Sequence, residues 1–400
     1  MRDINLAIFT RRPAFEKALH VGAPYVEPET QKRFHTYMDG AFERAYLTNN
    51  GPLVQELEKE LAHLHSVRYC AATCNATLAQ LFILSALDLR GDVLLPSFTF
   101  IATVHACLWQ NLRPVFCDIR PDTLMIDPAD AARRITSQTS AIIGVHLFGN
   151  ICEVESLTEL ARRHRLKLMF DAAHAFGCSL GSASVGGFGD AEFFSFHSTK
   201  FFGTFEGGAM TTNDAELDRK IRYLRNFGFR TYDDVGFLGL NGKMSEASAA
   251  MGLASLPEIP RRIERLEATH RAYRDGLSRV PGITVLPAGR EGRSNFHYLV
   301  TLIDEARFGV SRDILYRVLW QENVLVRRYF YPGCHAMSFY RSSEPNDYPH
   351  LPVTEDICKR ILCFPTNLNN PKGDIDSIVG LLQRIHDNAE RVAIWAESQP

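Results

Sequence analysis

The sequence predicts an α/β protein with a large, mostly parallel sheet and a smaller α+β domain at its C-terminal end. Short apolar runs alternate with amphipathic helical segments, the pattern of a parallel sheet that is covered on both faces. A charged helical stretch, residues 256–277, separates this part from a remainder that mixes strand and helix patterns. A chain of 400 residues is long enough for two domains. We therefore expect a large domain with an N-terminal arm at 1–255 and a small domain at 256–400.

The N-terminal arm extends to about Asn50 and contains one predicted helix around Thr30–Ala45. A second helix is predicted after Gly51 and Pro52, where leucines recur at helical spacing. The apolar runs that predict strands of the large domain lie at 93–98, 114–119, 141–149, 166–176 and 193–196, and a short strand precedes the apolar helix that opens near Asn75. A further helix is predicted from Asn213 to about Arg225.

In the small domain, strands are predicted at 283–287, 296–303 and 323–330. Helices are predicted at 311–321 and 376–396. This mixture, following one long connecting helix, is what indicates a separate α+β unit.

The bulk composition excludes several classes of protein. The formal net charge is −2 with no long block of one sign, which argues against nucleic acid as a partner. No apolar run approaches the roughly 20 residues of a membrane span, and the N-terminus lacks the apolar stretch of a signal peptide. Nine cysteines without CxxC spacing indicate reduced thiols. We expect a cytoplasmic protein with no membrane partner and, since no histidines pair on one helix, no metal site.

The chemistry is expected in residues 191–210, where Lys200 follows an apolar, aromatic strand pattern and is flanked by phenylalanines. Partial burial of a lysine disfavours its ammonium form and lowers its pKa. The amine then becomes available as a nucleophile toward an aldehyde. The alternative is a surface lysine whose stem covers apolar side chains.

A second candidate, Asp171, ends another predicted buried strand, 29 residues before Lys200. A carboxylate there is costly unless it meets a cation, and a protonated pyridine nitrogen would supply one. The alternative is an aspartate that caps a helix N-terminus. Together, a strand-end aspartate and a strand-end lysine are what a pyridoxal phosphate enzyme needs.

A phosphate would need backbone N–H groups at a helix start, and residues 73–77 open an apolar helix directly after a short strand. Ser195 could add a hydroxyl donor. Phe98 and Phe100 follow another strand end and could offer a face to an aromatic ring, although by periodicity alone both would be core residues.

Four motifs, PSFTFIAT, FDAAHAFG, SFHSTKFFGTFEGG and LGLNGKM, occur in the order and spacing of one family. In them the sequence resembles the sugar aminotransferases of the DegT/DnrJ/EryC1/StrS family, and the resemblance runs from residues 49–62 to 327–337. It implies the fold of type I pyridoxal 5′-phosphate (PLP) enzymes, which is that of aspartate aminotransferase.

The resemblance also implies a role for each matching residue. Lys200 would bind the cofactor aldehyde, Asp171 would face the pyridine nitrogen, Phe100 would stack on the ring, and His174 would lie beside it. The positions that match the phosphate-binding residues are Asn75, Ala76, Thr77 and Ser195. Asn241 is similar to the asparagine that reaches the cofactor phosphate of the neighbouring subunit, which implies a homodimer with shared active sites.

A lysine at position 200, where some family members carry histidine and act as dehydratases, implies transamination with L-glutamate as the donor. The stretch HSTKFFGTFEGG looks closer to members that aminate C4 of a dTDP-4-keto-6-deoxyhexose, in the biosynthesis of deoxysugars for antibiotics or polysaccharides. For the sugar nucleotide the expected contacts are Lys243, Tyr331 and His335, although Lys243 alone could be a surface charge and Tyr331 could pack at the domain interface. Three alternatives stay open: amination at C3, a keto-cyclitol substrate, and a non-catalytic PLP-binding regulatory protein.

Overall fold

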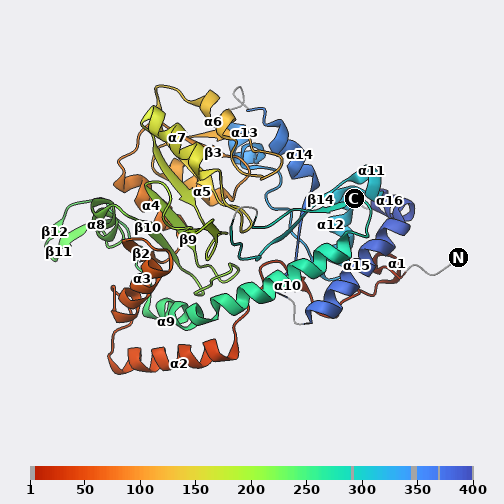
Figure 1. Ribbon diagram of the computed structural model, residues 1–400, viewed down its shortest axis with the longest axis horizontal. Helices are drawn as coiled ribbons and strands as arrows, with labels where there is room; N and C mark the ends of the chain where they lie inside the picture. The colour runs from red at the N-terminus through yellow and green to blue at the C-terminus, as the bar shows by residue number, and fades with distance from the viewer. Residues whose placement is uncertain (1–4, 290–291, 344–348, 368–369, 399–400) are drawn as a thin grey trace.

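A computed structural model describes residues 5–289, 292–343, 349–367 and 370–398. The large domain is built on a seven-stranded sheet (Figure 1). In spatial order its strands are β2 (Tyr69–Thr73), β10 (Gly208–Thr212), β9 (Ala191–Ser195), β6 (Lys167–Asp171), β5 (Thr139–Val145), β3 (Asp92–Pro96) and β4 (Arg113–Cys117). Within this sheet β10 is antiparallel to both of its neighbours, and the other six strands all run in one direction. The predicted α/β class with a mostly parallel sheet is confirmed.

Helices cover both faces of this sheet, which explains why its strands read as continuous apolar runs. Val93 and Leu95 of β3 pack into one core, and Leu94 packs into the other. The first core is formed with α4 (Ala76–Ala86), α5 (Ile101–Trp109) and α8 (Ala215–Leu224). On the opposite face lie α3 (Pro52–Leu64), α6 (Pro128–Arg134), α7 (Val154–His164) and α9 (Glu246–Ser255).

The helix α10 (Ile259–Leu277), preceded by the short η1 (Leu256–Glu258), connects the two domains (Figure 1). Ile259 and Ile263 belong to the core of the large domain, whereas Tyr273 and Leu277 belong to that of the small domain. The small domain contains an antiparallel sheet of β13 (Ile283–Val285), β14 (Leu299–Ile303) and β16 (Ile361–Phe364). Its main helices are α12 (Arg312–Gln321), α14 (Pro352–Arg360), α15 (Pro371–Asp387) and α16 (Ala389–Glu397).

The start of the N-terminal arm lies with the small domain rather than with the large one. Leu6 is fully buried in the small-domain core, next to α1 (Ala7–Thr10). The strand β1 (Leu19–His20) pairs in parallel with β15 (Val324–Leu325). The division expected at residue 255 therefore has an exception, because the first part of the arm crosses to the C-terminal elements before α2 (Pro28–Glu43) begins.

Two predicted elements of the small domain differ in the structure. The strand predicted at 323–330 is reduced to the two residues of β15, and the helix predicted at 376–396 begins earlier and is interrupted at Asn388. Asn388 has φ −121° and ψ 25°, outside the helical region, so α15 and α16 are separate helices. β10 was not predicted, because its sequence GAMTT carries little of the apolar alternation that marks a strand.

The remaining elements are short. They are β7 (Ser179–Leu180), β8 (Ala183–Ser184), β11 (Phe229–Thr231), β12 (Asp234–Val235), α11 (Glu305–Phe308), η2 (Cys334–Ala336) and α13 (Ser338–Ser343). In the described part of the chain no helix combines the length and apolar character that crossing a bilayer requires. All nine cysteines are free thiols.

Candidate active site

The carboxyl ends of the parallel strands bring the predicted residues to one edge of the large sheet. Gly208, the first residue of β10, pairs with Thr73 on one side and with Ser195 on the other. On the far side of β9, Asp171 pairs with Phe193. The helix start after β2, the hydroxyl at the end of β9 and the carboxylate at the end of β6 therefore lie along the same edge.

Lys200 lies in the loop after β9 and is partly buried. Burial lowers the pKa of its amine to about 8, although the nearby Asp171 carboxylate acts in the opposite direction. The buried side chains of Phe201 and Phe202 follow it directly. At mildly alkaline pH much of the amine is therefore neutral and able to act as a nucleophile or a base.

Asp171 is 7% exposed and is held by two hydrogen bonds. Its Oδ2 accepts from Thr103 Oγ1 at 2.8 Å, and its Oδ1 accepts from the Ala173 backbone N–H at 3.0 Å. Burial raises the pKa of this carboxyl, against the effect of the two hydrogen bonds and of the Lys200 charge. Residues 172–178 form turns rather than a helix, so Asp171 is not a helix cap. The carboxylate is therefore fixed in a site that favours an additional cation.

Sequence reasoning missed Thr103, although the motif PSFTFIAT contains it. Thr103 lies on α5, and its hydroxyl is 3.0 Å from that of Thr99, one helical turn earlier. The signal available was a pair of threonines four residues apart, one just before the helix and one in its otherwise apolar first turn.

His174 forms part of an aromatic wall beside Asp171. Its ring centroid lies 4.4 Å from that of Tyr298, 5.6 Å from that of Phe148 and 5.9 Å from that of Phe330. Burial, together with the charges of Lys200 and His297, lowers the pKa of His174 well below its ordinary value. Its Nδ1 is buried without a hydrogen-bond partner among the described residues, so a neutral imidazole presents one unused polar atom in the wall.

The predicted phosphate-binding residues form the N-terminus of α4. Asn75 caps this helix, since its Oδ1 accepts from the Leu78 N–H at 2.9 Å. A Cβ atom at Gly208 would lie only 2.6 Å from the backbone nitrogen of Ala76, so a glycine is needed for β10 to pass the helix start. The Asn75 side chain therefore organises the helix start, and the first-turn N–H groups, Ala76 and Thr77 included, are the anion donors it offers, with the Ser195 hydroxyl on the neighbouring strand.

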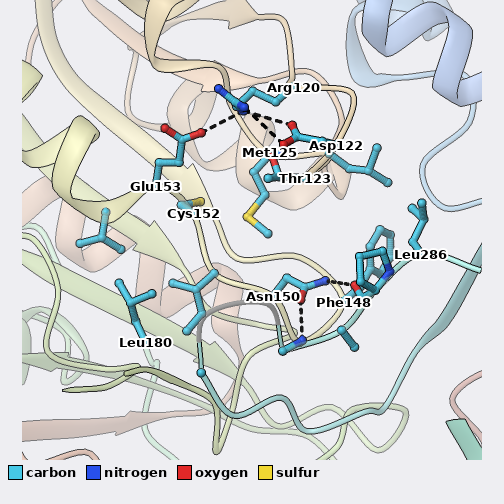
Figure 2. Close-up of a pocket in the computed structure, with 18 of the residues that line it drawn as sticks. Arg120, Asp122, Thr123, Met125, Phe148, Asn150, Cys152, Glu153, Leu180 and Leu286 are labelled. Carbon is cyan, nitrogen blue, oxygen red and sulfur yellow. Dashed lines mark hydrogen bonds and ion pairs between the residues drawn. The ribbon is translucent and has the colours of Figure 1, made fainter. Parts of the chain in front are cut away.

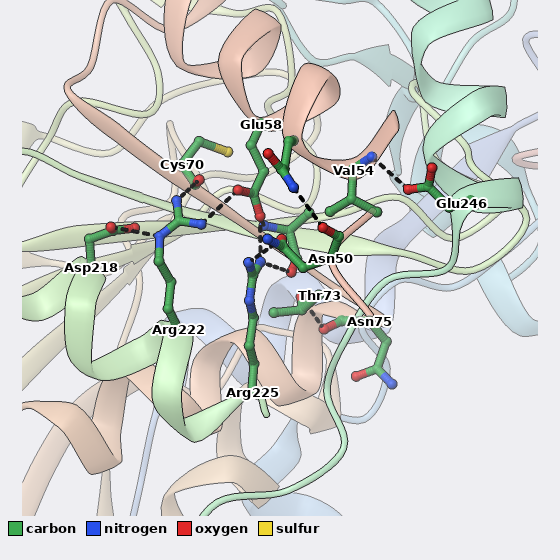
Figure 3. Close-up of polar contacts among 12 residues, drawn as sticks. Asn50, Val54, Glu58, Cys70, Thr73, Asn75, Asp218, Arg222, Arg225 and Glu246 are labelled. Carbon is green, nitrogen blue, oxygen red and sulfur yellow. Dashed lines mark hydrogen bonds and ion pairs between the residues drawn. The ribbon is translucent and has the colours of Figure 1, made fainter. Parts of the chain in front are cut away.

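A buried ionic cluster, which the sequence did not indicate, holds this helix start in place (Figure 3). Glu58 of α3 accepts from the Ala72 N–H at 2.9 Å and pairs with Arg222 at 2.7 Å and with Arg225. Arg225 also donates to the Ala72 carbonyl at 2.6 Å. Because Ala72 is the second-last residue of β2, just before the turn into α4, the cluster fixes the position of the turn. The Arg225 carbonyl in turn accepts from the Gly242 N–H at 2.9 Å.

The loop that contains Asn241 and Lys243 therefore runs beside the helix start. Asn241 is exposed and forms a backbone bridge with Asn226. Lys243 forms a backbone bridge with Thr73; its Nζ donates to Asn226 Oδ1 at 2.9 Å and lies 4.6 Å from the Phe227 ring centroid. The Lys243 amine is thus held within its own loop.

The other predicted contacts differ in accessibility. Phe100, at the N-terminus of α5, is 56% exposed and presents an open face. Tyr331 is 43% exposed, with the Arg312 and Arg328 guanidinium carbons 5.0 and 4.7 Å from its ring centroid. His335 is 1% exposed, and its Nδ1 lies 2.6 Å from Ser97 Oγ. The expected direct contact between His335 and a substrate is not supported, because this side chain is enclosed within the fold.

A cavity of about 400 Å³ lies near the carboxyl ends of β4 and β5, between the two domains (Figure 2). Arg120 lies at its edge and pairs with Asp122 and Glu153. Phe148 and Tyr298 line it and also contact His174. Neither Lys200 nor Asp171 lines this cavity, so the aromatic wall separates it from the predicted chemistry.

Comparison with known proteins agrees with this arrangement. The model of the DegT/DnrJ/EryC1/StrS aminotransferase family matches residues 28–383. A Shigella dysenteriae protein named dTDP-4-amino-4,6-dideoxy-D-glucose transaminase is 36% identical over 371 residues, which cover 92% of this chain and 100% of that protein. An Escherichia coli protein of the same name is 38% identical over 359 residues, which cover 88% of this chain and 95% of that protein. A crystal structure of DesI in the presence of its TDP-sugar product has a TM-score of 0.93 and 42% identity, covering 98% of this chain and 99% of that one.

Proposed function

The chain belongs to the DegT/DnrJ/EryC1/StrS aminotransferase family, and from this membership we propose that it transfers an amino group from L-glutamate to C4 of a dTDP-4-keto-6-deoxyhexose. The observation that carries the proposal is a partly buried amine, Lys200, beside a buried carboxylate, Asp171, at the substrate edge of an aminotransferase sheet. The names of the Shigella and Escherichia relatives support the choice of sugar and carbon. The nine free thiols favour a reducing compartment, so we place the reaction in the cytoplasm.

The residues at this edge fit PLP. The Asp171 carboxylate is held in a dry site where a pyridinium would balance its charge, and the first turn of α4 offers N–H groups to a phosphate. Phe100 offers an open aromatic face, and His174 offers an unused nitrogen. When bound, PLP supplies an aldehyde for amines and a ring that absorbs electrons from the substrate carbon.

Lys200 and Asp171 then have different roles in the reaction. Lys200 Nζ, neutral above about pH 8, takes a proton from the α-carbon of glutamate and later returns a proton to the sugar carbon. Asp171 would face the ring nitrogen of the bound cofactor with its negative charge, and Thr103 holds that carboxylate in place. Glutamate leaves as 2-oxoglutarate, and the sugar ketone becomes an amine, so the amino group is conserved over the two halves of the reaction.

We expect the holoenzyme to aminate a dTDP-linked 4-keto-6-deoxyhexose with glutamate, and mass spectrometry of the products is the measurement. The panel should include the GDP-linked sugar, a 3-keto isomer and a free keto-cyclitol, with no-glutamate controls. Preferred turnover of the 3-keto sugar or the cyclitol would replace the proposed substrate. No amine from any ketone, with PLP bound, would favour a regulatory protein instead.

We also propose a homodimer in which Asn241 of one chain reaches the phosphate of the other. The hairpin of β11 and β12 precedes Asn241 and projects from the large domain (Figure 1). Tyr232 is 99% exposed and Leu238 97% exposed there, and a second subunit would cover such side chains.

Mixed dimers test this sharing. Inactive Lys200→Ala chains, mixed and refolded with weakened Asn241→Ala chains, should recover activity because one site per mixed dimer combines an intact lysine with an intact asparagine. Random pairing predicts recovery to about a quarter of the parent activity. Activity no higher than the sum of the two separate variants would show that Asn241 acts within its own chain.

A further inference from the structure

Lys200 lies in neither a helix nor a strand, but in a loop, residues 196–207, that joins β9 to β10. Backbone hydrogen bonds close the two ends of this loop. Within the loop the Lys200 N–H donates to the His197 carbonyl at 2.8 Å, but this local bond does not fix the tip relative to the rest of the protein. A base must be placed within a few tenths of an ångström to be effective. The carbonyls of Thr199 and Phe201, which flank Lys200, each accept a hydrogen bond from outside the loop.

The Thr199 carbonyl is held from the small domain. His297, two residues before β14, is 2% exposed, and its Nε2 donates to the Thr199 oxygen at 2.9 Å. Burial, partly opposed by this bond, lowers the pKa of His297 to about 4, so the ring is neutral at pH 7 and its Nε2 carries the proton. Thr366 donates to the carbonyl of His297 at 2.6 Å and fixes the residue itself.

The Phe201 carbonyl is held from the connecting helix. Arg262 of α10 is 7% exposed, and its Nη1 donates to the Phe201 oxygen at 2.8 Å. Its Nη2 pairs with the Glu27 carboxylate at 2.6 Å, and its Nε donates to the same group at 3.1 Å. Burial alone would raise the pKa of Glu27, but the hydrogen bond and charge of Arg262 outweigh this and lower it. Arg262 is thus paired with Glu27, and one of its N–H groups is directed at the loop.

Arg262 and His297 come from different elements, 35 residues apart in the chain, and converge on the backbone carbonyls of the residues immediately before and after Lys200. At Gly22, in the N-terminal arm, a Cβ atom would lie 2.8 Å from the Thr199 oxygen, so the arm closes over the same carbonyl.

We propose that His297 and Arg262 are positioning residues that hold the backbone on both sides of Lys200, so that the small domain and the connecting helix set where its amine stands. The effect on turnover rests on the proposed function of Lys200. The effect of these residues on the Lys200 amine can be measured in the protein without any turnover.

Two substitutions remove the donors: His297→Leu and Arg262→Met. Competitive acylation of the full-length, cofactor-free protein with acetic anhydride, followed by mass spectrometry, gives the pH midpoint of Lys200 labelling. The parent midpoint is expected at about 8, because only the neutral amine reacts and its fraction rises with pH. Each variant should move the midpoint at least about one unit toward the ordinary lysine value, since a loosened loop exposes the amine to water.

In the PLP-loaded enzyme, kcat should fall about 10- to 100-fold in each variant, with KM for the sugar nucleotide changed much less. Arg265→Met is the matched control. Arg265 lies on the same helix and is partly buried, but it donates to Asn367 and stacks on Tyr25 instead of touching the loop. His297→Gln keeps an N–H donor at this position, so its labelling midpoint and kcat should stay close to those of the parent enzyme.

An unchanged midpoint and kcat in both folded donor variants would overturn the proposal, and so would an equal shift in Arg265→Met. If His297→Leu or Arg262→Met does not fold, Glu27→Gln provides a milder test, because it removes only the charge that orients Arg262 and should shift the midpoint in the same direction. If no keto sugar is aminated by the parent enzyme, the proposed function fails, but the labelling midpoints still decide whether the amine is held.

Discussion

Replacing Lys200 by alanine will reduce kcat/KM for amino transfer by about 10⁴-fold or more. General acid–base catalysis alone contributes roughly 10²- to 10⁴-fold, and this residue is expected to act both as the base and as the amine that binds the cofactor. The fold should survive, because Lys200 lies in a loop and a partly buried amine stabilises the native state little.

Steady-state kinetics of purified Lys200→Ala, with circular dichroism to verify the fold, check this expectation. Lys167→Ala is the matched control, because Lys167 lies at the opposite end of β6 in an exposed pair with Asp190. That change should alter turnover by no more than about twofold. A Lys200→Ala enzyme within tenfold of the parent would exclude Lys200 as the catalytic amine.

The second large effect is expected at Asp171. Asp171→Asn keeps the size of the side chain but removes the charge opposite the ring nitrogen, and kcat/KM should fall by about 10²- to 10³-fold, the range seen when one preorganised electrostatic group is lost. The packing should remain, because Thr103 can accept a hydrogen bond from the new amide as well as donate to the carboxylate.

Thr103→Val tests the positioning of the Asp171 carboxylate separately from its charge. It leaves the carboxylate charged but removes one donor, so its effect should be smaller than that of Asp171→Asn. Thermal unfolding of both variants, measured beside their kinetics, distinguishes a chemical loss from a folding loss. Near-parental turnover in folded Asp171→Asn would contradict the role of the carboxylate in holding the ring charge.

The sequence was sufficient to predict which residues lie at this edge of the sheet, because the carboxyl ends of parallel strands lie at the same edge. An apolar run that ends in Asp171 and another that leads to Lys200 must end at the same edge, whatever the loops do. The α4 start was predictable for the same reason, since it follows β2 directly.

Contacts across the chain were not predictable in this way. Arg262 and His297 meet the Lys200 loop only because α10 and the small domain fold back over it, and neither residue stands out in a solvated, charged stretch or a strand flank. The burial of His335 was likewise not predictable, because its side chain meets Ser97, a residue 238 positions earlier in the chain. Local pattern fixes which strand end a residue occupies, whereas domain packing decides which side chains surround it.

The role of Lys200 as the cofactor-binding amine can be tested by reducing the PLP-loaded enzyme with borohydride and mapping the labelled peptide by mass spectrometry. We expect one pyridoxyl group per chain, attached to Lys200, and we expect this label to be lost when glutamate is added before reduction. A label on Lys243 or any other lysine, or a label on Lys200 that glutamate does not prevent, would contradict this role.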